Sequence, residues 1–166
     1  LDYQAGYRSI YDLNYLRANV RGGEGFDFYY PSAGATGNEA SAERLSQTRL
    51  PITDGAYGKP WVFKPKAIKE WWQNAHYNRP GGAESATPTS WVPESKPIWF
   101  TEFGCPAVDK GSNQPNVFID PKSSESFAPF FSRRSRDDLI QRRYIQALQS
   151  FFDPGDEDYV AGSNPS

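Results

Sequence analysis

Glu102 is the residue whose place in the sequence most strongly suggests chemistry. It ends the apolar run Ile98-Trp99-Phe100 within "KPIWFTEFGCP", residues 96–106. A carboxylate buried at such a point costs several kcal/mol unless it is paired, so it is paired, solvated or functional. Glycoside hydrolysis uses two carboxylates, one as acid and one as nucleophile or base, and Glu102 suits the nucleophile role. From the residues alone, a structural glutamate held by an arginine or by backbone N–H groups is the favoured interpretation.

Six further side chains are candidates for binding a sugar substrate. Pyranose rings present apolar C–H faces that stack on tryptophan and tyrosine, and their hydroxyl groups bond to carboxylates and imidazole. The candidates are Asp27, Tyr29, Asp54, Tyr57, Trp61 and His76. Each has a structural alternative: Asp27 paired with a lysine or arginine, Asp54 in an ordinary Asp-Gly turn, and His76 bonded within its own loop.

Metal and thiol chemistry are not indicated. His76 and Cys105 are the only histidine and the only cysteine, and neither an HExxH nor a GxSxG motif is present. This set cannot form a tetrahedral zinc site, a disulfide or a recognisable catalytic triad. The sequence therefore predicts no metal and no cofactor, and Cys105 is expected to be a small buried residue.

Charge and hydropathy exclude two classes of partner. The 166 residues include 20 acidic and 18 basic side chains, which argues against a dedicated nucleic-acid binder. Asp137 and Asp138 interrupt the arginines between residues 133 and 143, a spacing that predicts an exposed helix face with ion pairs. No apolar run reaches the length of a membrane span. Because methionine is absent, even at position 1, we expect a piece of a longer polypeptide.

The elements that must position these residues alternate between helix and strand. Helices are predicted from Ser9 to the Gly22-Gly23 pair, after Pro65, and from a Ser135 cap to Asp153. Strands are predicted at Gly25–Pro31 and at 97–103. Residues 32–43, 50–65, 76–95 and 104–134 are expected to be loops. Of the adjacent pair on the second helix, one of Trp71 and Trp72 should be packed and the other half-exposed.

Alternation of strands and helices favours a parallel sheet with right-handed crossovers, and hence a slice of an α/β domain. In such folds ligands bind at the carboxyl ends of the strands. A strand at 97–103 would place Ile98, Phe100 and Glu102 on one face, with Glu102 at the mouth of the site. Trp99 would then point the other way and pack under an outer helix.

Several long blocks of the sequence resemble the TIM-barrel-like domain of the gene transfer agent host-specificity proteins, which are phage-tail-like hub or tip proteins. The resemblance covers about residues 7–152. It rests on "YDLNYLRANVRGGEGFDFYY", "PITDGAYGKPWVF", "WWQNAHYNRPGG", "TPTSWVPESKPIWFTEFGCPAVDKGSNQPNVFIDPKSSES" and "RDDLIQRRY".

This resemblance implies an α/β fold that is part of a (β/α)8 TIM-barrel-like domain. Gly25–Pro31 would be the sixth strand and Pro97–Phe103 the seventh, with the surrounding helices and long loops. The barrel part would occupy residues 1–152, followed by an acidic, flexible tail at 153–166. In related retaining glycoside hydrolases the nucleophile is a glutamate on the seventh strand, which corresponds to Glu102. Their acid/base lies on the fourth strand, outside this sequence, so the fragment alone is expected to be inactive.

The implied function is that of a glycoside-hydrolase-like module that recognises, and in the intact domain hydrolyses, a cell-envelope polysaccharide or peptidoglycan glycan. The alternative is a non-catalytic carbohydrate-binding, receptor-binding or structural tail module. Its partners would be that glycan and other tail or hub proteins, in the tail of a phage-like particle made in the cytoplasm and acting at the bacterial surface. Open sheet edges in a partial barrel would also favour homo-oligomers.

Overall fold

The computed structural model describes residues 1–32, 41–157, 159 and 161. The chain divides into two compact units, which are described separately. The first contains Leu1–Val20 and Trp99–Asn164, and the second is formed chiefly by Arg21–Ile98. No helix in the described residues is long and apolar enough to cross a membrane.

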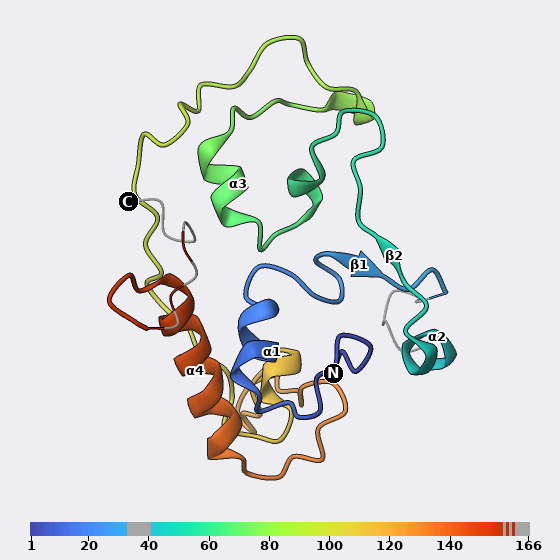
Figure 1. Ribbon diagram of the computed structural model, residues 1–166, viewed down its shortest axis with the longest axis vertical. Coiled ribbons are helices and arrows are strands. Elements are labelled where there is room, and N and C mark those ends of the chain that lie inside the picture. Colours follow the sequence, from blue (N-terminus) through green and yellow to red (C-terminus); the bar gives the residue numbers. More distant parts are fainter. Residues whose placement is uncertain (33–40, 158, 160, 162–166) are drawn as a thin grey trace. The chain divides into compact units, whose positions relative to one another are not determined.

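Regular secondary structure is sparse (Figure 1). The elements of the described residues are α1 (Leu13–Ala18), β1 (Phe28–Tyr29), α2 (Ser41–Ser46), β2 (Leu50–Pro51), α3 (Ile68–Gln73) and α4 (Asp138–Phe152). Short 3-10 turns lie at η1 (Pro60–Phe63), η2 (Pro80–Gly82) and η3 (Gly111–Asn113). The expected helix after Pro65 and the expected C-terminal helix are confirmed.

Packing of α1 against α4 forms the core of the first unit (Figure 1). The side chain of Ile140 is fully buried, and Ala147 and Phe151 follow it along the same face of α4. Leu16 of α1 is also buried. The predicted amphipathic face of the last helix is therefore confirmed, because its apolar positions repeat at helical spacing.

Aspartates cap both helices of this core. Asp12 accepts hydrogen bonds from the first turn of α1, and Asp137 accepts one from the backbone N–H of Ile140 at 3.1 Å. The Asp137 carboxylate also accepts the hydroxyl of Tyr11 at 2.7 Å, which ties the two helices together. The predictions of Ser9 and Ser135 as caps were wrong, because the helices begin later than the capping-box pattern suggested.

The second unit departs from the predicted parallel sheet. β1 pairs antiparallel with β2, in the register Phe28↔Pro51 and Tyr29↔Leu50. Only two residues of the expected strand Gly25–Pro31 are strand, because the preceding backbone groups are used in a tight turn in which Asp27 N–H donates to Gly23 at 2.7 Å. Part of the predicted loop 32–43 lies outside the described residues, and its end belongs to α2.

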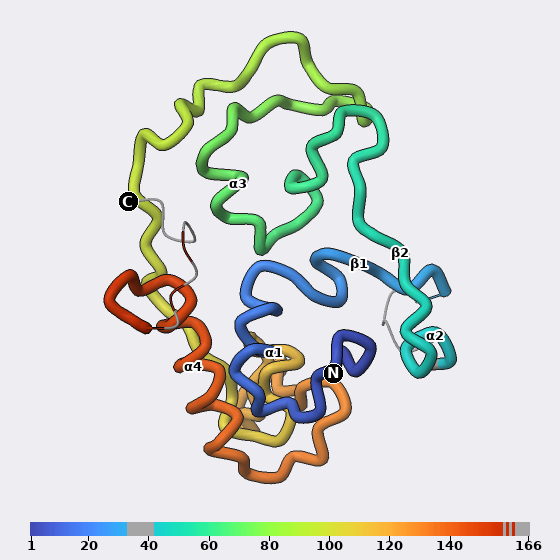
Figure 2. Tube along the Cα trace, in the orientation of Figure 1, coloured from blue at the N-terminus to red at the C-terminus, as the bar shows by residue number. Residues whose placement is uncertain are grey.

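The strand predicted at 97–103 is not formed. The trace from Ala83 to Ala107 has no helix or strand (Figure 2). A strand needs a neighbour for its backbone groups, and within the described residues no backbone–backbone hydrogen bond involves 97–104. Trp99 is 79% exposed, so its predicted packing under a helix was wrong. The ring of Phe100 packs against the ring of Phe152.

The α1–α4 packing gives a direct stability prediction. Replacing Ile140 by alanine leaves a cavity at a fully buried position. It should lower the free energy of unfolding by about 2–5 kcal/mol. The matched variant Leu139→Ala, on the neighbouring position that is 45% exposed, should cost less than about 1 kcal/mol. Urea denaturation followed by circular dichroism measures both, and equal effects would contradict the assigned face of α4.

Candidate functional site

The second unit contains two chain segments that run antiparallel without forming regular strands. Three backbone hydrogen bonds join residues 72–78 to residues 85–94. These bonds run from Glu94 N to Trp72 O (3.1 Å), from Thr89 N to His76 O (2.7 Å) and from Ser85 N to Asn78 O (2.8 Å). This pairing brings side chains from both segments to one place.

Four aromatic rings meet on this pairing, and we refer to Trp61, Trp71, His76 and Trp91 as the tryptophan cluster. The ring of His76 lies 4.3 Å from that of Trp71, 5.3 Å from that of Trp91 and 5.9 Å from that of Trp61, measured between centroids. The rings of His76 and Trp91 are nearly parallel, at 5°. Such offset contacts fix ring orientation as well as burying apolar area.

The cluster remains accessible at Trp71. Its side chain is 46% exposed, whereas that of the adjacent Trp72 is buried and donates its indole N–H to the carbonyl of Lys96. The prediction that one of this pair is packed and the other half-exposed is confirmed. The indole N–H of Trp91 is buried without a hydrogen-bond partner, which costs about 1–3 kcal/mol.

His76 makes a structural contact, but with α3 and not within its own loop as the alternative interpretation had it. Its Nε2 lies 2.7 Å from the carbonyl oxygen of Trp71, which is on α3. This bond and the flanking rings hold the imidazole in the middle of the cluster. The assignment of His76 as a ligand contact stays a prediction. In such a role, His76 would act through the faces of the rings around it.

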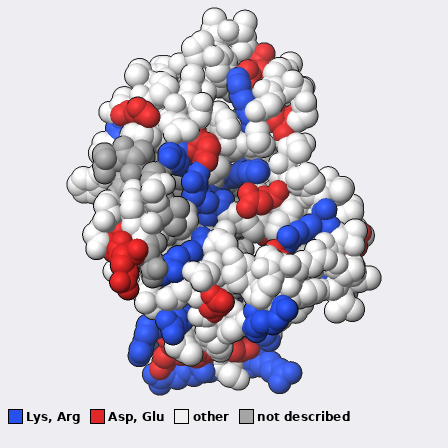
Figure 3. Space-filling view, in the orientation of Figure 1, with Lys and Arg blue, Asp and Glu red and all other residues white. Residues whose placement is uncertain are grey.

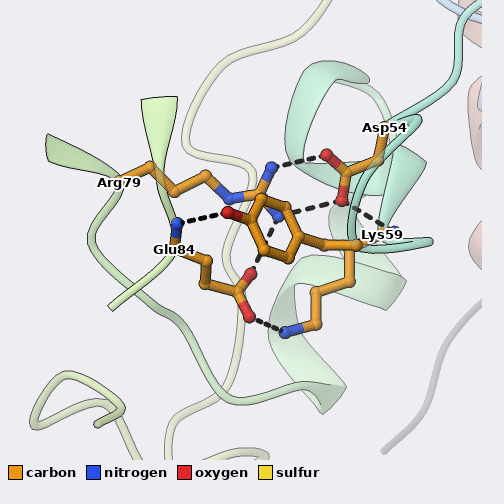
Figure 4. A network of polar contacts seen from close by, with 5 residues as sticks. Asp54, Lys59, Arg79 and Glu84 are labelled. Atoms are coloured by element: carbon orange, nitrogen blue, oxygen red, sulfur yellow. Dashed lines mark hydrogen bonds and ion pairs between the residues drawn. The ribbon is translucent and has the colours of Figure 1, made fainter. Parts of the chain in front are cut away.

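A polar network lies on the same unit (Figure 4). Asp54 accepts two hydrogen bonds from the guanidinium of Arg79, at 2.5 and 2.9 Å, and a third from the backbone N–H of Lys59 at 2.9 Å. Its side chain is only 1% exposed. The Asp-Gly turn interpretation was thus incomplete, because the carboxylate is the buried acceptor of a bidentate arginine pair.

Glu84 completes the polar network from the other side. Its carboxylate accepts from Lys59 Nζ at 2.5 Å and from Arg79 Nη2 at 2.9 Å, and its backbone N–H donates to the hydroxyl of Tyr57 at 2.9 Å (Figure 4). The guanidinium of Arg79 also lies over the ring of Tyr57, 4.7 Å from its centroid. Two cations and two carboxylates therefore compensate one another.

The network has a clear electrostatic signature. Hydrogen bonds from Arg79 hold the pKa of the Asp54 carboxyl below its usual value, and hydrogen bonds from Lys59 and Arg79 do the same for Glu84. The pKa of Arg79 is raised, mainly by its bonds to Asp54. All of these groups are ionised at neutral pH, so the network acts as a fixed clamp between residues 54–59 and 79–84.

Asp27 and Tyr29 lie at β1, and their surroundings are those of a surface turn. The Asp27 carboxylate accepts from the backbone N–H of Gly23 at 3.0 Å and lies 3.4 Å from Lys64 Nζ. Tyr29 is 45% exposed. Asp27 thus has the lysine partner of its structural alternative, and nothing in its contacts assigns either residue to substrate.

Glu102 lies in the first unit, on the irregular segment that was expected to be a strand. Its side chain is exposed and has no hydrogen bond or ion pair among the described residues. The arginine partner of the structural alternative is therefore not found there. Nearby Cys105 is buried, as predicted, and burial raises the pKa of its thiol to about 11, which makes it a poor nucleophile.

The structure therefore groups only some of the predicted residues. Trp61 and His76 share the tryptophan cluster, and Asp54 and Tyr57 share the polar network. The sequence reasoning missed the other members of both groups, namely Trp71, Trp91, Lys59, Arg79 and Glu84. Trp91 stands among Pro, Thr and Ser residues, and that loop context was the available signal. Within the described part of the chain, no group of three or more His, Cys, Asp and Glu residues could hold a metal ion.

The clamp predicts a pH-dependent stability. Because the folded-state pKa values of Asp54 and Glu84 are depressed, their contribution is complete above the unfolded values and is lost as pH falls through and below about 4. Thermal denaturation from pH 7 to pH 3 should show a falling Tm. Asp54→Asn should lower Tm at pH 7 and flatten this dependence, whereas Glu125→Gln, at an exposed and unpaired carboxylate, should change neither. An unchanged profile for Asp54→Asn would contradict the clamp.

Comparison with known proteins identifies the family to which this chain belongs. A search of curated proteins found no match to this chain. The profile of the GTA (gene transfer agent) TIM-barrel-like domain matches residues 1–165. Because this match spans almost the whole sequence, the chain belongs to the family of gene transfer agent TIM-barrel-like domains.

Proposed function

We propose that this domain is the glycan-recognising, glycoside-hydrolase-like part of a phage-like particle. The observation that carries the proposal is the half-exposed ring of Trp71, set beside His76 and Trp91. An exposed aromatic face supported by other rings suits the apolar face of a pyranose. Membership of a gene transfer agent family supports placement in such a particle.

The polar network supports recognition by reducing the mobility of the loops around the cluster. Lys59 immediately precedes η1, which carries Trp61, and Arg79 follows His76 by three residues. The clamp therefore anchors the chain on both sides of two cluster residues. A site that is ordered before binding loses less conformational entropy when the ligand arrives, which favours affinity.

The proposed ligand is a cell-envelope polysaccharide or the glycan of peptidoglycan. The particle tail would present the domain at the bacterial surface, beside other tail or hub proteins. Aromatic stacking recognises the ring face and tolerates variation among sugars, so the cluster defines a class of ligand. On this proposal the described residues bind glycan, and cleavage is a separate property of the complete domain.

Hydrolysis is the second candidate function, and the free carboxylate of Glu102 is the observation that favours it. Glu102 is exposed and has no partner within the described part of the chain, so it is available to a substrate in a way that the clamped Asp54 and Glu84 are not. A retaining mechanism would require a second carboxylate about 5–5.5 Å away, supplied by another part of the domain. The proposal of recognition does not depend on this step.

Binding should depend on Trp71. Trp71→Ala removes the exposed ring and should weaken retention on insoluble peptidoglycan about tenfold in apparent Kd, equivalent to about 1.4 kcal/mol. Trp99→Ala removes a ring that is 79% exposed outside the cluster, and it should leave retention unchanged. Co-sedimentation with purified peptidoglycan measures both variants. Equal losses in the two, or none in Trp71→Ala, would remove the cluster from the binding site.

Hydrolysis should depend on Glu102 if the complete domain is an enzyme. Glu102→Gln keeps the size of the side chain but removes its nucleophilic charge, so sugar release should fall by several orders of magnitude. Release of reducing ends from cell-envelope glycan by the complete domain is the measurement. Equal turnover by Glu102→Gln would exclude Glu102 as nucleophile while leaving glycan recognition intact.

A further inference from the structure

A second surface feature lies in the first unit, where Asp109 organises the loop that precedes α4. Its carboxylate accepts from the backbone N–H of Arg133 at 2.8 Å, from the backbone N–H of Ser135 at 2.9 Å and from the hydroxyl of Ser132 at 2.9 Å. These bonds, led by the one from Arg133, hold the pKa of the Asp109 carboxyl below its usual value. One ionised side chain thus holds three residues of the loop, Ser132, Arg133 and Ser135.

Backbone pairing closes the base of this loop. Asp109 N–H donates to Ser135 O at 2.8 Å, and Asp137 N–H donates to Ala107 O at 2.9 Å. Val108 and Arg136 form an antiparallel bridge between them. Residues 130–135 are therefore a tethered loop, and we refer to them as the arginine loop.

The arginine loop carries two exposed arginines that are neighbours in the sequence. Arg133 and Arg134 are both exposed, and among the described residues neither side chain has a hydrogen bond or ion pair. In contrast, the guanidinium of Arg136 is paired with the carboxylate of Asp138 at 2.9 Å. Phe131, on the same loop, is 65% exposed. Acidic and basic groups are mixed on the face drawn in Figure 3.

The backbone at this loop is locally strained. Phe131 and Arg134 have φ values of +63° and +66°, in the left-handed region that favours glycine. The conformation is maintained by bonds to the carbonyls on the loop: Lys110 Nζ donates to Phe131 O, and Asn113 Nδ2 donates to Phe130 O at 2.9 Å. Strain of this kind persists where the surroundings over-determine the chain.

The carboxylates near these arginines in the sequence are already engaged: Asp109 holds the loop backbone, Asp137 caps α4 and Asp138 pairs with Arg136. Among the described residues the two guanidinium groups therefore have no carboxylate partner and are available to an anionic ligand.

We propose that the arginine loop docks an acidic polysaccharide, with Arg133 and Arg134 binding its carboxylate groups and Phe131 lying against a sugar face. The proposal rests on the proposed glycan recognition and adds the charge class of the ligand. Guanidinium forks match carboxylates in bidentate geometry, and the exposed aromatic adds apolar contact. Two exposed arginines are a small basic surface, which is less than a nucleic-acid binder normally carries.

Affinity electrophoresis of the 166-residue chain tests this surface with alginate, a carboxylate-bearing polysaccharide, and with neutral dextran. Alginate should retard the wild-type chain more than dextran does. Arg133→Ala/Arg134→Ala should weaken apparent alginate affinity about tenfold, as expected for losing two charge-assisted contacts. The matched control Lys96→Ala/Lys122→Ala removes the same two charges from exposed lysines elsewhere, and it should change the affinity less than about twofold.

A conservative variant separates recognition from charge alone. Arg133→Lys/Arg134→Lys keeps both charges but loses the bidentate forks, so its affinity should fall between wild type and the alanine variant. Thermal denaturation should show equal Tm values for the variants at Arg133 and Arg134 and for Lys96→Ala/Lys122→Ala, since all four substituted positions are exposed. This comparison of Tm values distinguishes a folding defect from a loss of binding.

Three results would overturn the proposal: no alginate retardation, equal losses in the two double-alanine variants, or binding to duplex DNA as tight as to alginate. These outcomes differ from a failure of the proposed function. Peptidoglycan retention that depends on Trp71 but not on the arginines would preserve glycan recognition and reject the arginine loop. Arginine-dependent alginate binding without peptidoglycan retention would reject the tryptophan cluster instead.

Discussion

The constraint on which this structure depends is the pairing of backbone polar groups in a chain with little helix or strand. Backbone N–H groups outside helices and strands need other partners, and here aspartates provide several of them. Asp54 accepts the backbone N–H of Lys59, Asp109 accepts two from the arginine loop, and Asp137 caps α4. Each carboxylate also binds a side chain, so it joins distant segments and removes the need for a continuous sheet at these points.

This arrangement connects the fold to the proposed function. In the second unit the Asp54–Arg79 clamp anchors the chain beside two residues of the tryptophan cluster, and in the first unit Asp109 anchors the arginine loop. In both cases a buried or half-buried carboxylate is used for support, and the side chains left at the surface are aromatic or cationic. Aromatic faces and guanidinium groups are the chemistry that sugars and acidic sugars require.

Long periodic segments were predictable from the sequence, and pairings between loops were not. The helix at Asp138–Phe152 was identified from its apolar spacing, and the burial of Trp72 beside an exposed Trp71 followed from adjacency on a helix. The apolar run at 97–103 was assigned to a strand because composition reports β propensity but not the presence of a neighbouring strand. Asp54 and Tyr57 were selected for binding, although Arg79 and Glu84, 25 and more residues away, make them parts of a clamp. Sequence spacing carries no signal for such contacts.

Residue-resolved NMR of the tryptophan side chains tests the central claim most directly. The chain has five tryptophans, so a ¹⁵N-labelled sample gives five indole N–H signals to follow during titration with soluble peptidoglycan glycan strands. Saturable shifts are expected for Trp61, Trp71 and Trp91, with no change for Trp99, which lies outside the cluster. An unperturbed cluster at saturating glycan, or a response confined to Trp99, would contradict it.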